Sequence, residues 1–351
     1  MEGKMNFEAA ILQSEDIKQL VTRSLPEPTE GGLTVRVNGC FICGSDLKTL
    51  KYGNSRVALD RIMGHEVSGT VVNIGKKVES FEIGDRVALG ADFPCMNCQN
   101  CKESNFGFCT TQMAIGHEHD GGFAEYISLP DAFVSHGPII KISDDLPLIL
   151  AALSEPVACC IRGFREQYFP KKVSEICIYG AGPIGAIIAT IAKIKFPDAN
   201  ISIIDPNPSR RDLLQHLKIG NFWFSDTRSE RINNFTPDLI FVACSVIAAQ
   251  KDAMKLVKAG GTVCLFGGLP SKINQLTIDP NLVHYKELCV YGTTGSDKQD
   301  VHKAVEIIRN NKTSFEKIIS CEFPLGKIND AVEVAKSGNK LKVFLRCERA
   351  K

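Results

Sequence analysis

Residues 176–185 read ICIYGAGPIG, and this stretch decides how the second half of the chain folds. Its first four residues are apolar and predict a buried strand, which runs directly into the glycine pattern GxGxxG. The apolar run 186–192 then predicts a helix after the last glycine. A strand, a glycine turn and a helix in this order are typical of a dinucleotide-binding unit. The residues that we assign to the turn are Gly180, Gly182, Pro183, Ile184 and Gly185.

Each glycine of this turn has its own physical task. We expect Gly180 to permit the tight turn, Gly182 to let a pyrophosphate approach the backbone, and Gly185 to let the helix pack closely on the strand. A second apolar strand ends in Asp205, whose carboxylate would accept hydrogen bonds from the adenosine ribose and repel a 2′-phosphate. We therefore expect NAD rather than NADP, a preference that the nearby Arg210 would soften.

The sequence pattern differs between the two parts of the chain. From about Val173, apolar strands alternate with glycine turns and apolar helices, which predicts an α/β fold with a doubly wound parallel sheet. The part before it predicts a mostly-β module, because it contains short strand-like runs separated by tight turns. Those runs are residues 33–37, 66–74 and 84–90. A last strand, at 342–345, follows two helical stretches near 300–311 and 327–337, and this tail could rejoin the first module.

Four of the fourteen cysteines lie close together in the sequence, with the spacing C-x2-C-x2-C-x7-C. Four thiolates complete the closed tetrahedral shell that structural zinc prefers, and such a shell leaves no position for a substrate. Free or disulfide-bonded surface cysteines are the alternative. A long chain without an export signal is an unusual place for a disulfide framework, so we favour the metal. The predicted ligands are Cys95, Cys98, Cys101 and Cys109.

Composition excludes several classes of function. The chain has 351 residues, with 41 Lys and Arg against 40 Asp and Glu, so its net charge of +1 gives no electrostatic basis for dedicated nucleic-acid binding. No apolar run approaches the roughly 20 residues that span a bilayer, and the first eight residues lack a signal-peptide core. We therefore expect a cytoplasmic protein with no membrane partner and no nucleic-acid partner.

Three further short motifs lie outside the nucleotide-binding part. They are CGSD at 43–46, GHE at 64–66 and SEP at 154–156. Any one of them alone is unremarkable, because a lone cysteine or histidine belongs more often to the core than to a metal site. Taken in order with the four cysteines and the glycine turn, however, these motifs make the chain resemble the zinc-dependent medium-chain dehydrogenases. The resemblance covers essentially the whole chain.

The resemblance implies two domains with a ligand cleft between them. A GroES-like, mostly-β catalytic domain would comprise residues 1–154 together with 296–351. A doubly wound Rossmann domain that binds NAD would comprise residues 155–295. The family usually forms homodimers or homotetramers by pairing edge strands of the Rossmann sheets, and residues 288–291 are the candidate edge strand. Dimer and tetramer both remain open.

The resemblance also implies a second, catalytic zinc ion. Cys43 and His65 would bind it, with Glu66 and Glu155 as the carboxylate ligands or near-ligands of the polyol dehydrogenase branch. Classical alcohol dehydrogenases have a cysteine where Glu155 stands. Thiolate, imidazole and carboxylate ligands leave positions open for water and a substrate oxygen, as catalytic zinc requires.

Three residues near these ligands would complete the catalytic machinery. Asp46 would orient His65 through its other ring nitrogen, and its alternative role is that of a turn or cap residue. Ser45 would be the first proton acceptor, and it too could simply cap a helix. Many relatives have a histidine where this chain has Lys48, so the outer end of the proton relay stays open. Lys48 could contact the cofactor, line the mouth of the site or be a solvated surface lysine.

The stretch His117-Glu118-His119 has metal-like spacing but precedes a family-like segment beside the substrate pocket. We favour pocket or surface histidines over a third metal site, because no further ligands cluster nearby. Lys48, Lys51 and Arg56 could favour an anionic substrate, although scattered cations are usually solvated.

The expected function is the reversible, NAD-linked and zinc-dependent oxidation of a secondary alcohol to a ketone. A polyol such as sorbitol is the leading candidate substrate. A sugar, a sugar phosphate or a cyclitol belongs to the same class of substrates. Threonine or an amino-cyclitol is an alternative substrate. A catalytically inactive NAD(H)-binding protein and a zinc-independent quinone-reductase-like enzyme are the other hypotheses, and the intact metal ligands argue against both.

Overall fold

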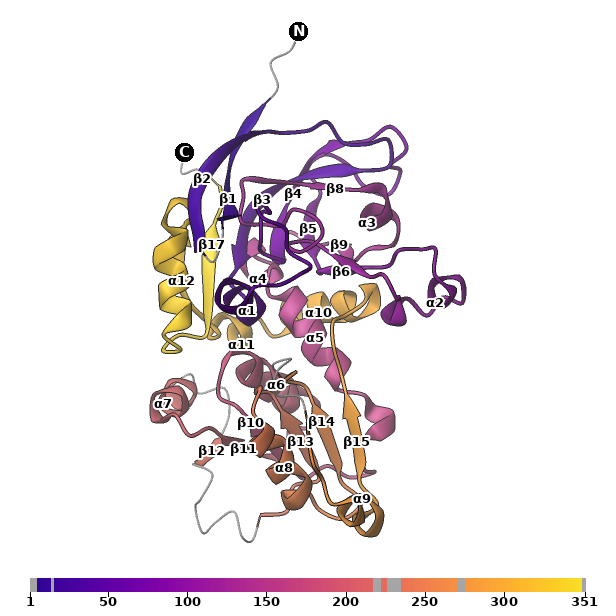
Figure 1. Ribbon diagram of the computed structural model, residues 1–351, viewed down its shortest axis with the longest axis vertical. Helices are drawn as coiled ribbons and strands as arrows, with labels where there is room; N and C mark the ends of the chain where they lie inside the picture. Colours follow the sequence, from indigo (N-terminus) through magenta and orange to yellow (C-terminus); the bar gives the residue numbers. More distant parts are fainter. Residues whose placement is uncertain (1–4, 14–15, 217–221, 226–234, 270–274, 349–351) are drawn as a thin grey trace. The chain divides into compact units, whose positions relative to one another are not determined.

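The computed structural model describes residues 5–13, 16–216, 222–225, 235–269 and 275–348. It divides into two compact units, drawn in Figure 1. Unit 1 comprises Met1–Ala158 and Gly295–Lys351, and unit 2 comprises Cys159–Thr294. This division leaves Glu155 in unit 1. The domain boundaries at 154 and 295 stay a prediction, because compactness does not show which segments fold independently.

Unit 2 is built on a six-stranded sheet in which every neighbouring pair is parallel. The strand order is β12-β11-β10-β13-β14-β15. In chain order this is 3-2-1-4-5-6, the order of a dinucleotide-binding sheet, with its reversal between β10 and β13. The predicted doubly wound parallel sheet is confirmed. The strands are β10 (Glu175–Tyr179), β11 (Asn200–Ile204), β12 (Phe222–Ser225), β13 (Leu239–Val242), β14 (Thr262–Leu265) and β15 (Cys289–Gly292).

Helices connect these strands and cover the sheet. α6 packs against β10 and β11, and α8 packs against β13 and β14. The connection through α6 leads from β10 toward one edge of the sheet, and the connection through α8 leads from β13 toward the other edge. Right-handed crossovers therefore place these two helices on opposite faces of the sheet. β10 is buried along residues 176–179, as a central parallel strand requires. The helices are α5 (Ser154–Gly163, which crosses the unit boundary), α6 (Pro183–Lys195), α7 (Pro208–His216), α8 (Ile247–Leu256) and α9 (Pro280–Lys286).

Unit 1 is built on a seven-stranded, mostly antiparallel sheet. Its strand order is β16-β17-β3-β4-β5-β9, and β8 also pairs with β3. Two small ribbons, β1-β2 and β6-β7, accompany it. The strands are β1 (Asn6–Gln13), β2 (Asp16–Ser24), β3 (Leu33–Phe41), β4 (Glu66–Ile74), β5 (Arg86–Leu89), β6 (Asp92–Phe93), β7 (Met113–Ala114), β8 (Tyr126–Leu129), β9 (Ile139–Lys141), β16 (Ile319–Pro324) and β17 (Lys342–Arg346).

The last strand of the chain lies in the sheet of this unit. β17 pairs antiparallel with β3, and buried side chains of both strands join the same core cluster. The helices are α1 (Gly44–Tyr52), α2 (Gln99–Lys102), α3 (Asp131–His136), α4 (Leu148–Ala151), α10 (Lys298–Asn310), α11 (Lys312–Glu316) and α12 (Ile328–Lys336). Within the described ranges, none of the helices has the length and apolar character needed to cross a membrane.

β3 extends farther than the predicted strand 33–37, because it continues through Gly39 to Phe41. Close packing requires a glycine at position 39. A Cβ atom on Gly39 would stand 2.1 Å from the ring of Phe344 and 2.5 Å from the carbonyl oxygen of Leu345, both on β17. The approach of β17 therefore explains both the glycine and the longer strand.

Candidate active site

The first group of predicted site residues lies at the start of α1. Cys43 is the N-cap residue, and Ser45 and Asp46 lie in the first turn. The backbone N–H of Cys43 donates a hydrogen bond to Asp46 Oδ2 at 2.8 Å. Asp46 therefore does cap this helix, which was its alternative role. Its other carboxylate oxygen, Oδ1, faces His65.

His65 immediately precedes β4, and its ring lies between Asp46 and Ser45. Its Nδ1 lies 3.6 Å from Asp46 Oδ1, and its Nε2 lies 3.3 Å from Ser45 Oγ. Only 5% of His65 and 2% of Asp46 are exposed. The carboxylate thus lies on one edge of the imidazole and the hydroxyl on the other, as a histidine ligand with an orienting carboxylate requires.

The pKa of His65 reflects the charges around it. Burial alone would lower this pKa, but Asp46, Cys43 and Glu155 together hold it well above the ordinary value for histidine. Burial raises the pKa of Asp46, and the nearby His65 opposes that shift. Two carboxyl groups and a thiol therefore converge on one imidazole, an arrangement that is suited to a cation at this position.

Glu66 is fully buried and forms an ion pair with Lys342 of β17, which is 2% exposed. The Lys342 ammonium donates to Glu66 Oε1 at 2.5 Å. Burial lowers the pKa of Lys342, but the Glu66 and Cys43 side chains outweigh this effect and raise it. Sequence reasoning missed Lys342, because a single lysine 276 residues away from its partner gives no local signal.

Replacing Lys342 with methionine should strongly destabilise unit 1. The change leaves a buried carboxylate without its cation, which costs about 3–5 kcal/mol. Urea unfolding of the zinc-loaded protein measures the loss, and Lys342→Arg, which keeps the charge, is the matched control. A loss below about 1 kcal/mol in the methionine variant would show that Glu66 does not depend on this pair.

The donor atoms of Cys43, His65 and Glu66 all lie within 4.8 Å of one another. A thiolate, an imidazole and a carboxylate are a suitable set for zinc, and three protein ligands leave a position open. Glu155, in the first turn of α5, is buried and close enough to His65 to raise its pKa. These residues fit the predicted catalytic zinc. Whether Glu66 or Glu155 supplies the carboxylate stays a prediction.

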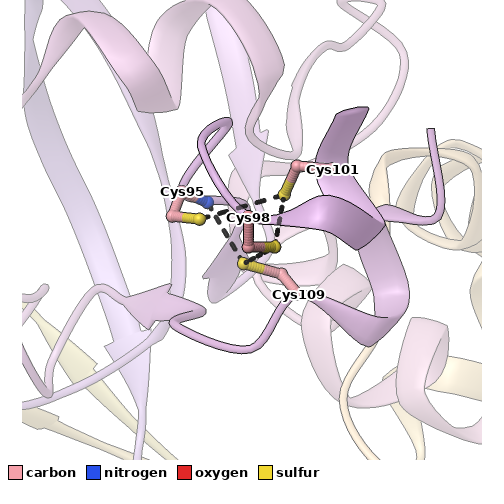
Figure 2. Close-up of side chains that lie close together, drawn as sticks. All are labelled: Cys95, Cys98, Cys101 and Cys109. Carbon is pink, nitrogen blue, oxygen red and sulfur yellow. Dashed lines mark hydrogen bonds between the residues drawn. The ribbon is translucent and has the colours of Figure 1, made fainter. Parts of the chain in front are cut away.

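The four predicted structural ligands also come together, as Figure 2 shows. The sulfur of Cys101 lies 4.0 Å from that of Cys95 and 3.5 Å from that of Cys98, and the Cys98 and Cys109 sulfurs are 3.9 Å apart. Zinc–sulfur bonds of about 2.3 Å place tetrahedral sulfurs about 3.8 Å apart. The four sulfurs therefore fit one zinc ion and are too far apart for disulfides.

The surroundings of this cluster favour thiolate in two of its members. A hydrogen bond from the Thr111 side chain, followed by backbone N–H donors, lowers the pKa of Cys95 to about 5. Backbone donors, with that of Thr110 first, lower the pKa of Cys98 to about 7. Burial raises the pKa of Cys101 to about 12. The loop thus prepares part of the shell for a cation, and a metal would have to deprotonate the rest.

The predicted nucleotide turn has the backbone geometry that its glycines suggested. Gly180 has a φ of 106°, and a Cβ on Gly185 would stand 1.9 Å from the carbonyl oxygen of Gly180. Gly182 is the N-cap of α6, and a Cβ there would meet nothing within 4 Å. Pro183 and Ile184 begin α6. This open glycine at a helix N-terminus fits the approach of a pyrophosphate.

Asp205 follows β11 directly and is held beside the turn. Its Oδ2 accepts a hydrogen bond from Ala181 N, and its Oδ1 accepts one from Asn207 N, each at 2.8 Å. Arg210 Nη1 lies 4.0 Å from Oδ2. The carboxylate is therefore fixed next to the glycine loop, where an adenosine ribose would lie.

The remaining candidates occupy different surroundings. Lys48 is exposed on α1. Arg56 forms a two-point ion pair with Glu118, and the ring of His119 packs on Phe93. The ring centroid of His117 lies 5.5 Å from that of His65. Of these residues, His117 is the one that the structure brings to the catalytic ligands.

Comparison with known proteins identifies the class. The model of the alcohol dehydrogenase GroES-like domain matches residues 29–139, and that of the zinc-binding dehydrogenase matches residues 183–310. The D-arabitol-phosphate dehydrogenase of Enterococcus avium is 26% identical and aligns over 94% of each chain. The L-threonine 3-dehydrogenase of Thermococcus kodakarensis is 29% identical and aligns over 93% of each chain.

A solved structure agrees with this class. The structure of an alcohol dehydrogenase from Escherichia coli CFT073, complexed with NADH, matches with a TM-score of 0.86 and 23% identity. The match covers 98% of this chain and all of that one. The fold is thus that of an alcohol dehydrogenase. The chain belongs to the zinc-dependent medium-chain dehydrogenase/reductase family, and within it resembles the polyol dehydrogenases.

Proposed function

We propose that this enzyme oxidises a secondary alcohol of a polyol to the ketone, with NAD as the hydride acceptor. The observation that carries the proposal is the convergence of Cys43, His65 and Glu66, with Ser45 at the Nε2 edge of the imidazole. Zinc held by these ligands would supply Lewis acidity toward the substrate oxygen, and bound NAD would supply the hydride chemistry.

The residues of the chain handle the proton that the oxidation releases. We assign Ser45 as its first acceptor, because a hydroxyl 3.3 Å from the His65 nitrogen lies next to the ligand set. Asp46 positions His65 from the opposite edge. We place Lys48 at the outer end of this relay, since it is exposed on the same helix.

Asp205 should decide the choice of nucleotide. Asp205→Asn keeps an acceptor oxygen but removes the charge that repels a 2′-phosphate, so the preference of kcat/KM for NAD over NADP should fall about tenfold or more. Steady-state kinetics with both nucleotides measures this ratio. Asp198→Asn, an exposed aspartate before β11, is the control. An unchanged ratio would count against the assignment.

Two relatives suggest the substrate class. D-arabitol-phosphate dehydrogenase acts on a polyol phosphate. The similarity to L-threonine 3-dehydrogenase suggests the oxidation of threonine as a second candidate function. The decisive assay follows NADH formation by zinc-replete protein with sorbitol, D-arabitol, D-arabitol phosphate, cyclitols, L-threonine and simple alcohols. We expect the strongest signal with a polyol. Zinc-loaded, folded protein that oxidises none of them would overturn the proposal.

We also propose a homo-oligomer that pairs the edges of the unit 2 sheets. β15 is an edge strand, and it covers the predicted segment 288–291 apart from Leu288. A reducing compartment such as the cytoplasm suits the protein, since its fourteen cysteines, all within the described ranges, form no disulfide.

A further inference from the structure

The segment 62–64 leads directly into His65 and is held by a second segment of the chain, 121–123. The carbonyl oxygen of Ile62 accepts a hydrogen bond from Gly121 N at 2.7 Å. Those of Met63 and Gly64 accept from Phe123 N at 3.0 Å and from Gly122 N at 2.8 Å. Three consecutive carbonyl groups before His65 are therefore tied to three consecutive amides.

Glycines bring the backbones of the two segments into close contact. Gly64 has a φ of 88°. A Cβ on Gly121 would stand 2.1 Å from the carbonyl oxygen of Gly64, and one on Gly116 would stand 2.8 Å from the same oxygen. Neither position has room for a side chain, so the loop that contains both glycines sets the place of Gly64. The backbone of His65 continues from that point.

Asp120, next to Gly121, connects this contact to its surroundings. Its Oδ1 accepts hydrogen bonds from Ile62 N and from Arg61 Nη1, each at 3.1 Å. Its Oδ2 accepts one from Arg23 Nη1 of β2 at 3.3 Å. Arg23 also donates to the carbonyl oxygen of Asp60. One carboxylate thus joins the segment before His65 to two arginines and to the β1-β2 ribbon.

These contacts are better suited to fixing geometry than to adding stability. The side chain of Asp120 is 39% exposed, and ion pairs at such positions contribute little to the free energy of unfolding. A carboxylate can, however, accept several directed hydrogen bonds at once. Zinc requires its ligands at closely defined distances, so a shift of the segment before His65 would weaken the hold on the metal.

We propose that Asp120 is a positioning residue for the catalytic zinc site, which holds segment 62–64 and through it the imidazole of His65. Asp120 acts through the backbone and contacts neither the metal nor the substrate. The inference rests on the proposed function, because that function makes His65 a zinc ligand. It adds a second support to that of Asp46, which faces the ring itself.

The test follows the release of zinc from the zinc-loaded enzyme to an excess of chelator. The phase that His65→Ala abolishes reports the catalytic site, and the phase that Cys98→Ala abolishes reports the four-cysteine site. Asp120→Ala should accelerate the His65-dependent phase about tenfold and leave the other phase unchanged. Asp120→Asn keeps an acceptor for Ile62 N but loses the charge, and we expect a smaller acceleration. This second variant also decides the matter where the alanine variant does not fold.

Asp85→Ala is the matched control in the same unit. Asp85 also joins a backbone amide to a cation, since its Oδ2 accepts from Glu82 N at 2.8 Å and lies 2.7 Å from Lys141 Nζ. Its own backbone bonds to Val71 of β4. Asp85→Ala should release zinc from both sites at the wild-type rates. Equal acceleration in this control would overturn the proposal, because it would show a general loosening of unit 1.

Cobalt-substituted protein gives a second readout that a change in stability alone does not move. With Co²⁺ in the His65-dependent site, Asp120→Ala should shift the visible absorption bands, and Asp85→Ala should not. Unchanged release rates and spectra in both Asp120 variants would overturn this inference alone. A wild-type enzyme without any His65-dependent zinc would overturn it together with the proposed function, so the two failures are distinguishable.

Discussion

Replacing His65 with alanine is expected to lower kcat by about a thousandfold or more, which corresponds to about 4 kcal/mol of transition-state stabilisation. The imidazole lies between Ser45 and Asp46, so its loss removes a metal ligand and separates the proton acceptor from the positioning carboxylate. NADH titration should give a nearly unchanged Kd, because the glycine turn and Asp205 belong to unit 2.

The matched control is His136→Ala, at the exposed end of α3 in the same unit, which should retain wild-type turnover. Metal analysis of both proteins completes the comparison, since His65→Ala should lose about one zinc per chain. Wild-type turnover in the His65 variant would contradict its role as a ligand.

Replacing Cys98 with alanine should act on stability rather than on chemistry. The variant keeps three of the four sulfurs that now lie within 4.8 Å of one another, which is one too few for a closed tetrahedral shell. We expect the loss of about one zinc per chain and a drop of about 3 kcal/mol or more in the free energy of unfolding, because metal binding contributes to the folding of this loop.

Cys321→Ala tests whether any partly buried cysteine would have the same effect. This residue lies on β16 and packs against the core of unit 1, away from the four-cysteine loop in the sequence. Its replacement should leave the zinc content unchanged. A Cys98 variant that kept both its zinc and its thermal stability would rule out the structural site.

The parts of the fold that the sequence predicts well are those with local signals. The strand and glycine turn at 176–185 are contiguous in sequence, and the four cysteines lie within one loop, so spacing alone predicts their arrangement. The motifs around Cys43 and His65 needed the family resemblance, because each alone has an ordinary structural explanation.

The parts that sequence reasoning missed depend on long-range packing. The Glu66–Lys342 ion pair joins β4 to the last strand, and the position of Asp92 next to Gly295 joins segments about two hundred residues apart. Neither Lys342 nor Asp92 belongs to a recognisable motif. Predicting the ion pair would require the sheet pairing of β17 with β3 and of β3 with β4, which periodicity alone does not give.

The central claim is zinc-dependent, NAD-linked oxidation of an alcohol. It is tested most directly by following NADH formation from D-arabitol or sorbitol on one preparation before zinc removal, after removal by a chelator, and after zinc is restored. The account predicts turnover in the first and third samples and a loss of about a thousandfold in the second. Equal turnover in the metal-free protein, with zinc absence verified by elemental analysis, would contradict it.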